Sequence, residues 1–228
     1  MRVCYFDTET TGLPTNKYPP DSDQQPHITQ LGMLLEINGI DVMRLDAFIK
    51  PDNWRIHPCS GTGISKKSTE LTGITQEMCE ESGIPIADAL EMFMIATEQA
   101  DAIVCHNTAF DTKIIGFEYA RLRPGAGPRE ILNGKPRLCT MKAATPICQL
   151  PQKGRRTTFK WPKLEEAMRF FYDEALEGAH SAIVDILATR RLFHTLLDEG
   201  AFDQEIFDLK AVGKLPKDFA SEFIPDNG

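Results

Sequence analysis

A short apolar run that ends in two acidic residues constrains this chain more than any other feature of its sequence. Residues 3–13 read VCYFDTETTGL, and residues 2–6 are typical of a buried β-strand. Because side chains in a strand alternate between two faces, Asp7 and Glu9 should point in the same direction. Two like charges beside a hydrophobic core repel each other and lose hydration, so we expect another group to stabilise them.

The size and composition of the chain are those of a globular protein with one large domain. It has 228 residues, 42% of them hydrophobic and 25% charged, and no apolar run approaches the roughly 18 residues of a membrane span. The N-terminus lacks the apolar core of a signal peptide, so we expect a cytoplasmic protein without a membrane partner. No two of the six cysteines have C-x-x-C spacing, which argues against a zinc or redox site.

The order of the predicted elements indicates an α/β fold. We expect a strand at 2–6, a hairpin over 28–51, helices at 64–71 and 84–99, a strand at 101–107, a helix at 110–123, a strand at 137–144, and helices at 163–171 and 181–198. This order predicts one domain over residues 1–199, with a mixed sheet and helices on both faces. The acidic tail over 200–228 is expected to pack on this domain or to dock a partner.

Two further acidic residues fall on helix faces that should be buried. Asp111 shares one face of its predicted helix with Ile114 and Ile115, at offsets of three and four residues. Asp185 shares the apolar side of the last predicted helix with Ile186 and several other apolar residues. One buried acid usually belongs to a salt bridge or a helix cap, but four acids require a common explanation.

Divalent cations are that explanation, because a carboxylate cluster is stable when metal ions supply the missing positive charge. Oxygen ligands favour Mg²⁺ or Mn²⁺ over zinc. Two such ions held by carboxylates stabilise both the attacking and the leaving oxygen of a phosphoryl displacement. The histidine at position 180 lies in the loop before Asp185, and histidine is the side chain best suited to proton transfer near neutral pH. We interpret His180 as the general base rather than as a solvent-exposed loop residue.

Three segments carry a resemblance to a known family. FDTETTGL, HNTAFD and HSAIVD occur in this order, and STELTGIT and KLEEAMRFF add to the pattern. Over about residues 1–197 the chain resembles the DEDD, or DnaQ-like, exonuclease superfamily, which includes the proofreading subunit of bacterial polymerase III, RNase T and viral relatives. The histidine five residues before the last aspartate is similar to the DEDDh branch. The resemblance implies an RNase H-like fold and 3′–5′ hydrolysis that releases nucleoside 5′-monophosphates.

The resemblance also implies roles for individual residues. Asp7, Glu9 and Asp185 resemble the direct ligands of two Mg²⁺ (or Mn²⁺) ions. Asp111 would assist through one metal or its water, and His180 would accept the proton of the attacking water. The terminal nucleotide would be held by residues of the first two motifs, namely Thr8, Thr10, Gly12, Leu13 and Asn107. His106 either shapes the site near Asp111 or packs at the end of a strand, and we do not assign it to the catalytic set.

A basic stretch interrupts the otherwise acidic chain. The net charge is −8, yet residues 121–163 contain eleven Lys or Arg and one acid. Within it, residues 154–163 combine cations with aromatic side chains that could bind phosphates and stack on bases, namely Arg155, Arg156, Phe159, Lys160 and Trp161. The alternative is that Trp161 packs into the core and the charges are solvated, and the sequence does not separate these interpretations.

The sequence therefore predicts a metal-dependent 3′–5′ exonuclease that acts on single-stranded nucleic acid, with DNA favoured. Alternatives are a 3′–5′ exonuclease that trims RNA or short oligonucleotides, a catalytically silent nucleic-acid-binding scaffold, and a phosphatase or nucleotide hydrolase that uses the same carboxylates. The five chemical positions disfavour the scaffold. A polymerase or other protein partner would bind through the tail over 200–228, and the protein is expected to be a monomer or a homodimer.

Overall fold

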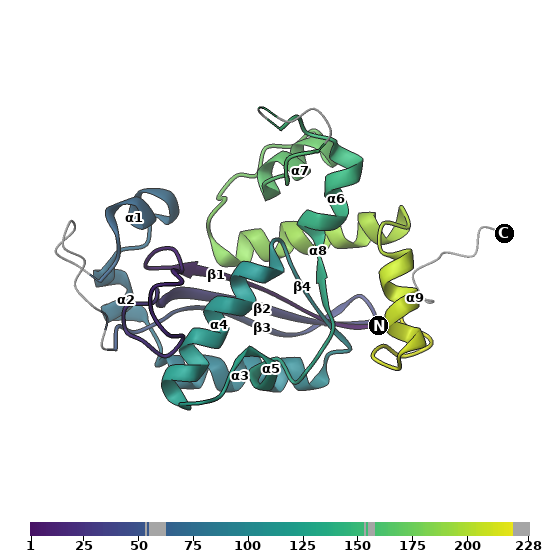
Figure 1. Cartoon of the computed structure of the whole chain (residues 1–228). Coiled ribbons are helices and arrows are strands. Elements are labelled where there is room, and N and C mark those ends of the chain that lie inside the picture. The colour runs from purple at the N-terminus through teal and green to yellow at the C-terminus, as the bar shows by residue number, and fades with distance from the viewer. Residues whose placement is uncertain (53, 55–62, 153, 155–157, 221–228) are drawn as a thin grey trace.

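One mixed β-sheet forms the centre of the molecule. The computed structural model describes residues 1–52, 54, 63–152, 154 and 158–220. The strands of the described part are β1 (Arg2–Thr10), β2 (Ile28–Ile37), β3 (Ile40–Phe48), β4 (Ala102–Cys105) and β5 (Arg137–Cys139), in the spatial order β3-β2-β1-β4-β5 (Figure 1). The first three strands are antiparallel and the pairs β1–β4 and β4–β5 are parallel. The predicted α/β fold with a mixed sheet is confirmed.

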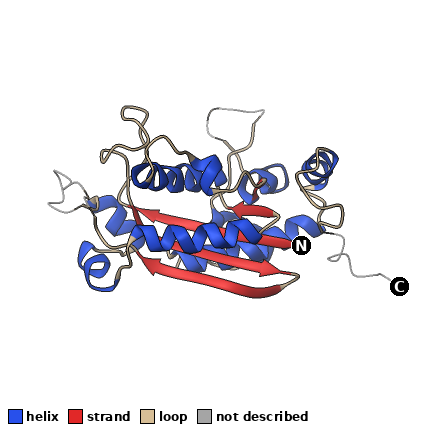
Figure 2. Ribbon diagram, turned by 90° about the horizontal axis from the view of Figure 1, so that it is seen from below, coloured by secondary structure: helices blue, strands red, loops and turns tan. Residues whose placement is uncertain are grey.

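Helices cover both faces of this sheet. They are α1 (Lys66–Thr72), α2 (Gln76–Ser82), α3 (Ile86–Gln99), α4 (Thr108–Leu122), α5 (Pro128–Ile131), α6 (Thr140–Cys148), α7 (Leu164–Tyr172), α8 (Ala182–Asp198) and α9 (Asp203–Ala211). One face packs against α3 and α4, and α3 crosses in front of the strands when the molecule is viewed from below (Figure 2). The other face packs against α8, with α6 and α7 beyond it (Figure 1).

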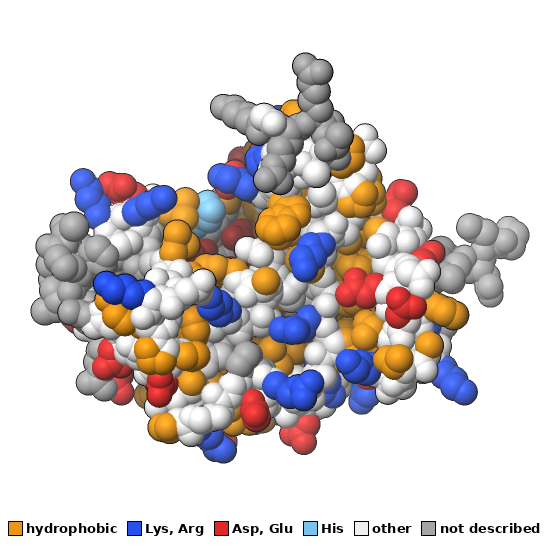
Figure 3. Space-filling view, viewed as in Figure 1, with side chains coloured by type: hydrophobic (Ala, Val, Ile, Leu, Met, Phe, Trp, Pro, Cys, Tyr) orange, Lys and Arg blue, Asp and Glu red, His pale blue; other side chains and the backbone are white. Residues whose placement is uncertain are grey.

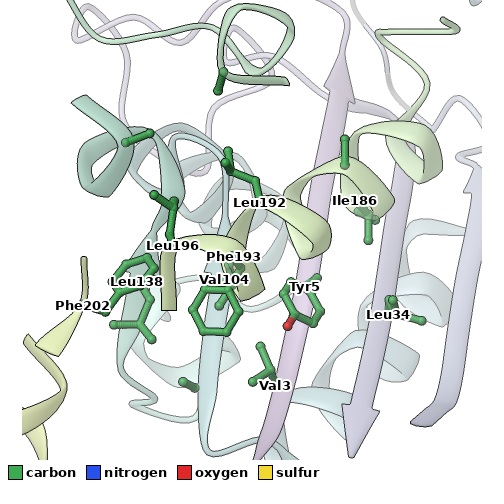
Figure 4. Close-up of a cluster of buried hydrophobic side chains, with 14 of the residues drawn as sticks. Val3, Tyr5, Leu34, Val104, Leu138, Ile186, Leu192, Phe193, Leu196 and Phe202 are labelled. Carbon is green, nitrogen blue, oxygen red and sulfur yellow. The ribbon is translucent and has the colours of Figure 1, made fainter. Parts of the chain in front are cut away.

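The hydrophobic core below α8 fixes the position of this helix on the sheet. Ile186, Leu192, Phe193 and Leu196 project from α8 toward the sheet residues Val3, Tyr5, Leu34 and Val104 (Figure 4). Tyr5 and Phe193 meet edge to face, with ring centroids 5.8 Å apart. All of these side chains are fully buried. The start of α8, which carries Asp185, is therefore held at a defined place beside β1 and β2.

Two predicted elements differ from those in the structure. The first strand was expected to end at residue 6 but continues to Thr10, because β2 pairs with it through its whole length. The predicted strand at 137–144 is wrong beyond Cys139, where α6 begins. Met141, Ala144 and Cys148 recur at helical spacing and are buried, so packing of one helix face decides this segment. The predicted hairpin over 28–51 is confirmed, and its turn lies at Asn38 and Gly39.

Residues 200–220 pack on the α8 side of the core. The helix α9 buries Ile206, and the turns around it bury Phe202, Leu215 and Phe219 in the same cluster as α8. In Figure 1 this segment lies at the far end of α8 from α1. Among the described helices, none combines the length and the apolar composition that crossing a membrane requires.

Candidate active site

The strand β1 carries the first two acids into a cavity. Val3 and Tyr5 face α8 and its core, and Asp7 and Glu9 continue the same alternation toward the carboxyl end of the strand. Both carboxylates line one cavity of about 570 Å³. A register shift in the β1–β2 ladder follows directly after Glu9, where the chain turns out of the sheet. The strand thus delivers both acids side by side to the edge of the core.

The helix α4 brings the third acid to the same place. Asp111 lies in the first turn of α4 and is 2% exposed. Its Oδ1 accepts a hydrogen bond from the Thr8 backbone N–H (3.1 Å) and another from the Thr8 hydroxyl (2.8 Å). Asn107 precedes α4 with a left-handed φ of 75°, a conformation that Asn tolerates better than most residues. Thr8, which faces away from Asp7 and Glu9, therefore couples the two acidic segments.

The helix α8 supplies the fourth acid, and a glycine in β2 lets this helix approach. Gly32 pairs with Asp7 across the β1–β2 ladder. A Cβ atom on Gly32 would lie 2.5 Å from Ile186 Cδ1 and 2.9 Å from Ala182 Cβ, so any larger residue would push α8 outward. The Ala182 N–H donates to Gln30 Oε1 (3.1 Å), which fixes the start of the helix. Asp185 thereby reaches the cavity that Asp7 lines.

His180 lies beside these acids, as predicted. Its backbone has a left-handed φ of 68°, and its N–H donates to Asp185 Oδ2 (3.2 Å). Its Nε2 lies 3.4 Å from Glu165 Oε1, on the first turn of α7. Ligand atoms of Glu9, His180 and Asp185 all lie within 4.8 Å of one another. The loop before α8 therefore turns the imidazole toward the carboxylates.

The four acids of the cluster form no ion pair with a Lys or Arg side chain in the part of the chain that the structure describes, and their pKa values reflect this. Burial and the charges of Asp111, Asp185 and Glu9 raise the pKa of Asp7 well above its usual range. Burial, with Asp185 and Asp111, raises the pKa of Glu9 to about 8. Burial raises the pKa of Asp111 to about 7, against the opposing hydrogen bonds from Thr8. Burial also raises the pKa of Asp185 to about 6. Each acid resists ionisation here unless positive charge is supplied.

The residues of this site fit a hard divalent cation. Asp185 Oδ1 is buried and has no hydrogen-bond partner among the described residues, although a buried carboxylate oxygen normally has one. The neighbouring donors are carboxylate oxygens and one imidazole. Oxygen-rich sets of this kind suit Mg²⁺ or Mn²⁺. A bound cation would give the unpaired Asp185 oxygen a partner and would lower the raised pKa values of the carboxyl groups.

The cavity is a hollow between two parts of the molecule. Figure 3 shows acidic side chains and a histidine at its bottom, between the region of α1 and that of α7. Of the predicted nucleotide-binding residues, it is lined by Thr8, Thr10, Gly12, Leu13 and Asn107. Thr10 Oγ1 donates to the Gly12 carbonyl (2.7 Å) and shapes this turn. Leu13 is 76% exposed and lines the cavity.

Sequence reasoning missed the opposite wall of the cavity. The helix α1 and its cap contribute Ser65, Lys67, Ser68, Leu71 and Thr72. The sequence predicted a helix over 64–71 but not its position, and the Ser65 N-cap and Gly73 C-cap are the local signals that bound it in the structure. The strand-interior Gly32 was also missed, although a glycine in a strand often marks a close approach of another element.

Residues 158–163, which we call the rim, lie beside the cavity at the start of α7. Trp161 is 61% exposed and Phe159 is 44% exposed, so the alternative that Trp161 packs into the core is wrong. Lys160 forms an ion pair with Glu166, and Lys163 lines the cavity. The predicted residues Arg155 and Arg156 lie outside the described residues. The rim therefore presents two aromatic rings to solvent.

The basic stretch over residues 121–163 does not form a single surface. Arg121 is bound to Glu118 (2.8 Å) and donates to the backbone carbonyls of Ser22 and Pro26, away from the acids. In the part of the stretch that the structure describes, Lys163 is the one cation that lines the acidic cavity. Cations that lie close together in the sequence therefore do not all lie close together in the structure.

Comparisons with known proteins agree with this geometry. An exonuclease family model, that of RNase T, matches residues 4–193. Exonuclease I of E. coli in complex with a dT13 oligonucleotide superposes with a TM-score of 0.65 and 16% identity, over 91% of this chain and 43% of that chain. Exonuclease I from Methylocaldum szegediense gives 0.61 and 18%, over 87% and 40%. A third structure, E. coli exonuclease I with a dA16 oligonucleotide, gives 0.65 and 15%, over 89% and 42%.

These matches show which features this chain shares with known exonucleases and how much of each chain is similar. At such identities the structures establish a common fold, and this chain spans less than half the length of the exonucleases that it matches. No curated protein sequence matches the chain. The family model, in contrast, covers most of the sequence and includes all three of the segments on which the resemblance rested. The chain belongs to the RNase T-type exonuclease family.

Proposed function

We propose that this protein is a metal-dependent 3′–5′ exonuclease that removes nucleoside 5′-monophosphates from single-stranded DNA. One observation carries the proposal: Asp7, Glu9, Asp111 and Asp185, from three separate elements, line one cavity beside His180. Such a convergence of acids is unfavourable without cations and is typical of sites for phosphoryl transfer. Membership of the exonuclease family supports the reaction class.

Asp7, Glu9 and Asp185 would hold two divalent ions, Mg²⁺ or Mn²⁺. When bound, the ions would neutralise the carboxylates and stabilise negative charge on the phosphate in the transition state. Asp111 would assist from the side, since Thr8 already fixes one of its oxygens. The bond that breaks joins phosphorus to the 3′ oxygen of the preceding nucleotide, and a water oxygen takes its place. The product is then a nucleoside 5′-monophosphate.

His180 would accept the proton of the attacking water. Its imidazole lies next to Glu9 and Asp185, within 4.8 Å of ligand atoms on both. The neutral ring takes up the proton as the new P–O bond forms, and solvent can remove that proton afterwards because the side chain remains partly exposed. Glu165 Oε1 lies 3.4 Å from Nε2 and would orient the ring.

The terminal nucleotide would occupy the remainder of the cavity. Its volume of about 570 Å³ lies within the 300–1,000 Å³ that is typical of small-ligand pockets. Exposed Leu13 and Leu71 offer apolar surface to a base, and the turn formed by Thr10 and Gly12 offers polar groups. Single-stranded DNA is favoured because the matching E. coli exonuclease I structures contain dT13 and dA16 oligonucleotides.

A direct assay on two nucleic acids tests the proposal. DNA and RNA single strands of one sequence, labelled at the 5′ end, are incubated with the protein and Mg²⁺, Mn²⁺ or EDTA. We expect a ladder that shortens from the 3′ end on DNA, disappears with EDTA and is absent with Asp7→Asn. Faster shortening of RNA would favour an RNA-trimming enzyme. Binding without cleavage would reject the proposal in favour of a nucleic-acid-binding scaffold. A protein partner of residues 200–228, and the choice between monomer and homodimer, remain predictions.

A further inference from the structure

The rim has few backbone contacts of its own. Phe159 forms an isolated bridge with Pro151, and the Lys160 N–H donates to the Leu150 carbonyl (2.9 Å). The Lys163 N–H donates to Glu166 Oε2 (2.8 Å) at the start of α7. Between these two anchors the chain passes through residues 161 and 162 without helix or strand pairing. The middle of the rim must therefore be held by something else.

His106 makes the contact that holds it. The residue follows β4 directly, and its ring is half-buried below the rim. His106 Nε2 lies 3.0 Å from the Pro162 carbonyl oxygen, and its Nδ1 lies 3.0 Å from Thr140 Oγ1 at the start of α6. One imidazole thus connects the end of the central sheet, the start of α6 and the rim.

The partners of the ring determine where its proton sits. A carbonyl oxygen accepts hydrogen bonds only, so Nε2 must carry the hydrogen that bonds to Pro162. Nδ1 is then free to accept from the buried Thr140 hydroxyl at 3.0 Å, a shorter contact than the 3.4 Å between this hydroxyl and the Cys105 carbonyl. Burial lowers the pKa of His106 to about 4, against the opposing effect of the Pro162 carbonyl, so the ring is neutral at pH 7. A neutral imidazole with both nitrogens engaged is a structural connector rather than a proton carrier.

The hydrogen bond from His106 can affect nucleic-acid binding because it fixes Pro162, which lies between Trp161 and Lys163. Proline has no backbone N–H, so its carbonyl is the only backbone group through which Pro162 can be anchored. Its neighbours on either side are Trp161, which is exposed, and Lys163, which lines the cavity. A shift of the Pro162 peptide would move both side chains relative to the carboxylates.

We infer that His106 is a positioning residue that holds the rim in place, and thereby sets the affinity for single-stranded DNA rather than the rate of bond cleavage. This inference rests on the proposed exonuclease function. The nucleic acid is recognised through stacking on Trp161 and through the charge of Lys163, both sequence-independent contacts.

Two substitutions at position 106 separate this role from general stability. The amide nitrogen of Gln can take the place of Nε2 and donate to Pro162, whereas that of the shorter Asn falls near Nδ1 and cannot. We therefore expect His106→Gln to behave like the natural protein. His106→Asn should raise KM for a single-stranded DNA of about 12 nucleotides roughly 5- to 10-fold, the loss of about one base stack, with kcat within about twofold.

A small substrate provides the internal reference. The p-nitrophenyl ester of thymidine 5′-monophosphate occupies the cavity, which His106 and Lys163 line, but lacks the further bases that would stack on Trp161. Its kcat/KM should therefore change by less than about twofold in either variant. A fall in kcat with KM unchanged, or equal effects of Gln and Asn on KM, would overturn the inference. Should His106→Asn fail to fold, Thr140→Val removes the partner of Nδ1 and is expected to raise KM in the same direction by a smaller factor.

A measurement without turnover keeps the two proposals distinct. The chain contains two tryptophans, so Trp54→Phe leaves Trp161 as the single emitter. In this background His106→Asn should lower the fluorescence anisotropy of Trp161, and His106→Gln should not. If the natural protein degrades no nucleic acid, the exonuclease proposal fails while this readout still reports on the contact. If degradation is normal and the Trp161 anisotropy is equal in all variants, the inference fails alone.

Discussion

The carboxylate cluster and the rim lie beside the same cavity, but the structure holds them by different means. Asp7, Asp111 and Asp185 project from regular elements whose positions are fixed by the sheet register and the core below α8. The rim has no regular structure around Trp161 and depends on single hydrogen bonds such as that from His106 to Pro162. The acids that we propose as metal ligands thus sit on the rigid part of the molecule, as precise chemistry requires.

This difference indicates that the carboxylate cluster and the rim contribute to different steps, cleavage and binding. A displacement of an angstrom among metal ligands removes activity, whereas a contact surface for a flexible strand tolerates adjustment. Substitutions in the cluster should therefore change the rate of cleavage, and substitutions in the rim should change affinity. The predictions below are ordered from the largest expected effect to the smallest, and each tests one side of this division.

Asp7→Asn should have the largest effect. The substitution removes a proposed metal ligand, and since even residues that only orient metal ligands contribute 10- to 100-fold, we expect kcat/KM to fall by more than about 100-fold. Circular dichroism should show a retained fold, because the amide keeps the size of the side chain. Asp88→Asn, an exposed acid on α3, is the matched control. An active Asp7→Asn variant would remove the basis of the metal proposal.

His180→Ala tests the proposed base. Loss of general base catalysis typically reduces rates by 10²- to 10⁴-fold, so we expect kcat to fall by about 100-fold or more while KM changes little. Steady-state kinetics on single-stranded DNA measure both constants. If KM rose and kcat remained, His180 would belong to the binding surface rather than to the chemistry.

Gly32→Ala tests whether the approach of α8 matters as much as the acids themselves. The new methyl group would meet Ile186 and the backbone of Ala182, at 3.0 Å from its carbonyl carbon, and push Asp185 away from Asp7. Small displacements of reacting groups can reduce rates by up to 10²-fold, and we expect about 10-fold in kcat. Gly127→Ala, whose methyl group would meet ordinary contacts, should leave kcat unchanged.

The metal-free protein should lose stability as pH rises. The folded-state pKa values of Glu9, Asp111 and Asp185 are about 8, 7 and 6, above the usual values near 4. The folded state therefore holds protons that the unfolded state releases, and the free energy of unfolding falls between about pH 4 and pH 8. In EDTA we expect a melting temperature at least about 4 °C lower at pH 8.5 than at pH 5.5.

Mg²⁺ should reverse this loss at pH 8.5, since binding to the folded state alone raises stability. Asp185→Asn should weaken the pH dependence in EDTA, because one acid with a raised pKa is gone. A melting temperature that is independent of pH in EDTA would mean that the acids are hydrated and far enough apart to ionise freely.

Lys160→Gln should have the smallest effect. The ammonium group already pairs with Glu166, and partly exposed ion pairs of this kind contribute about 0–1 kcal/mol. We expect KM for single-stranded DNA to change by less than about twofold, because a paired charge offers little to phosphate. A larger rise in KM, with a weaker dependence of binding on salt, would mean that Lys160 leaves Glu166 when the strand binds.

The sequence predicted the acids because their signals are local. Alternation in β1 placed Asp7 and Glu9 together, and helical spacing placed Asp111 and Asp185 on buried faces, all of which line one cavity. The extra length of β1 was missed because polar residues such as Thr8 and Thr10 hide a strand that its partner stabilises. Local periodicity therefore predicts the face on which a side chain lies better than the residue at which a helix or strand ends.

The rim and its surroundings could not be predicted in this way. The contact that holds Pro162 comes from His106, 56 residues earlier in the chain, and no local pattern connects the two. The helix α2 was missed because its sequence QEMCEES buries only Cys79 and so lacks an apolar face. The helix α6 was taken for a strand because its apolar run is short and contains Pro146. Such features depend on tertiary contacts.

The alternation of β1 has a consequence for how this protein can vary. Substitutions at single positions of the strand change one side chain, but a residue inserted or deleted before Asp7 would reverse every side chain that follows it. Thr8 and Thr10 would then face α8 while Asp7 and Glu9 turned toward the opposite core. Among solved structures that share this fold at 15–18% identity, we therefore expect the length of this strand to vary less than its composition.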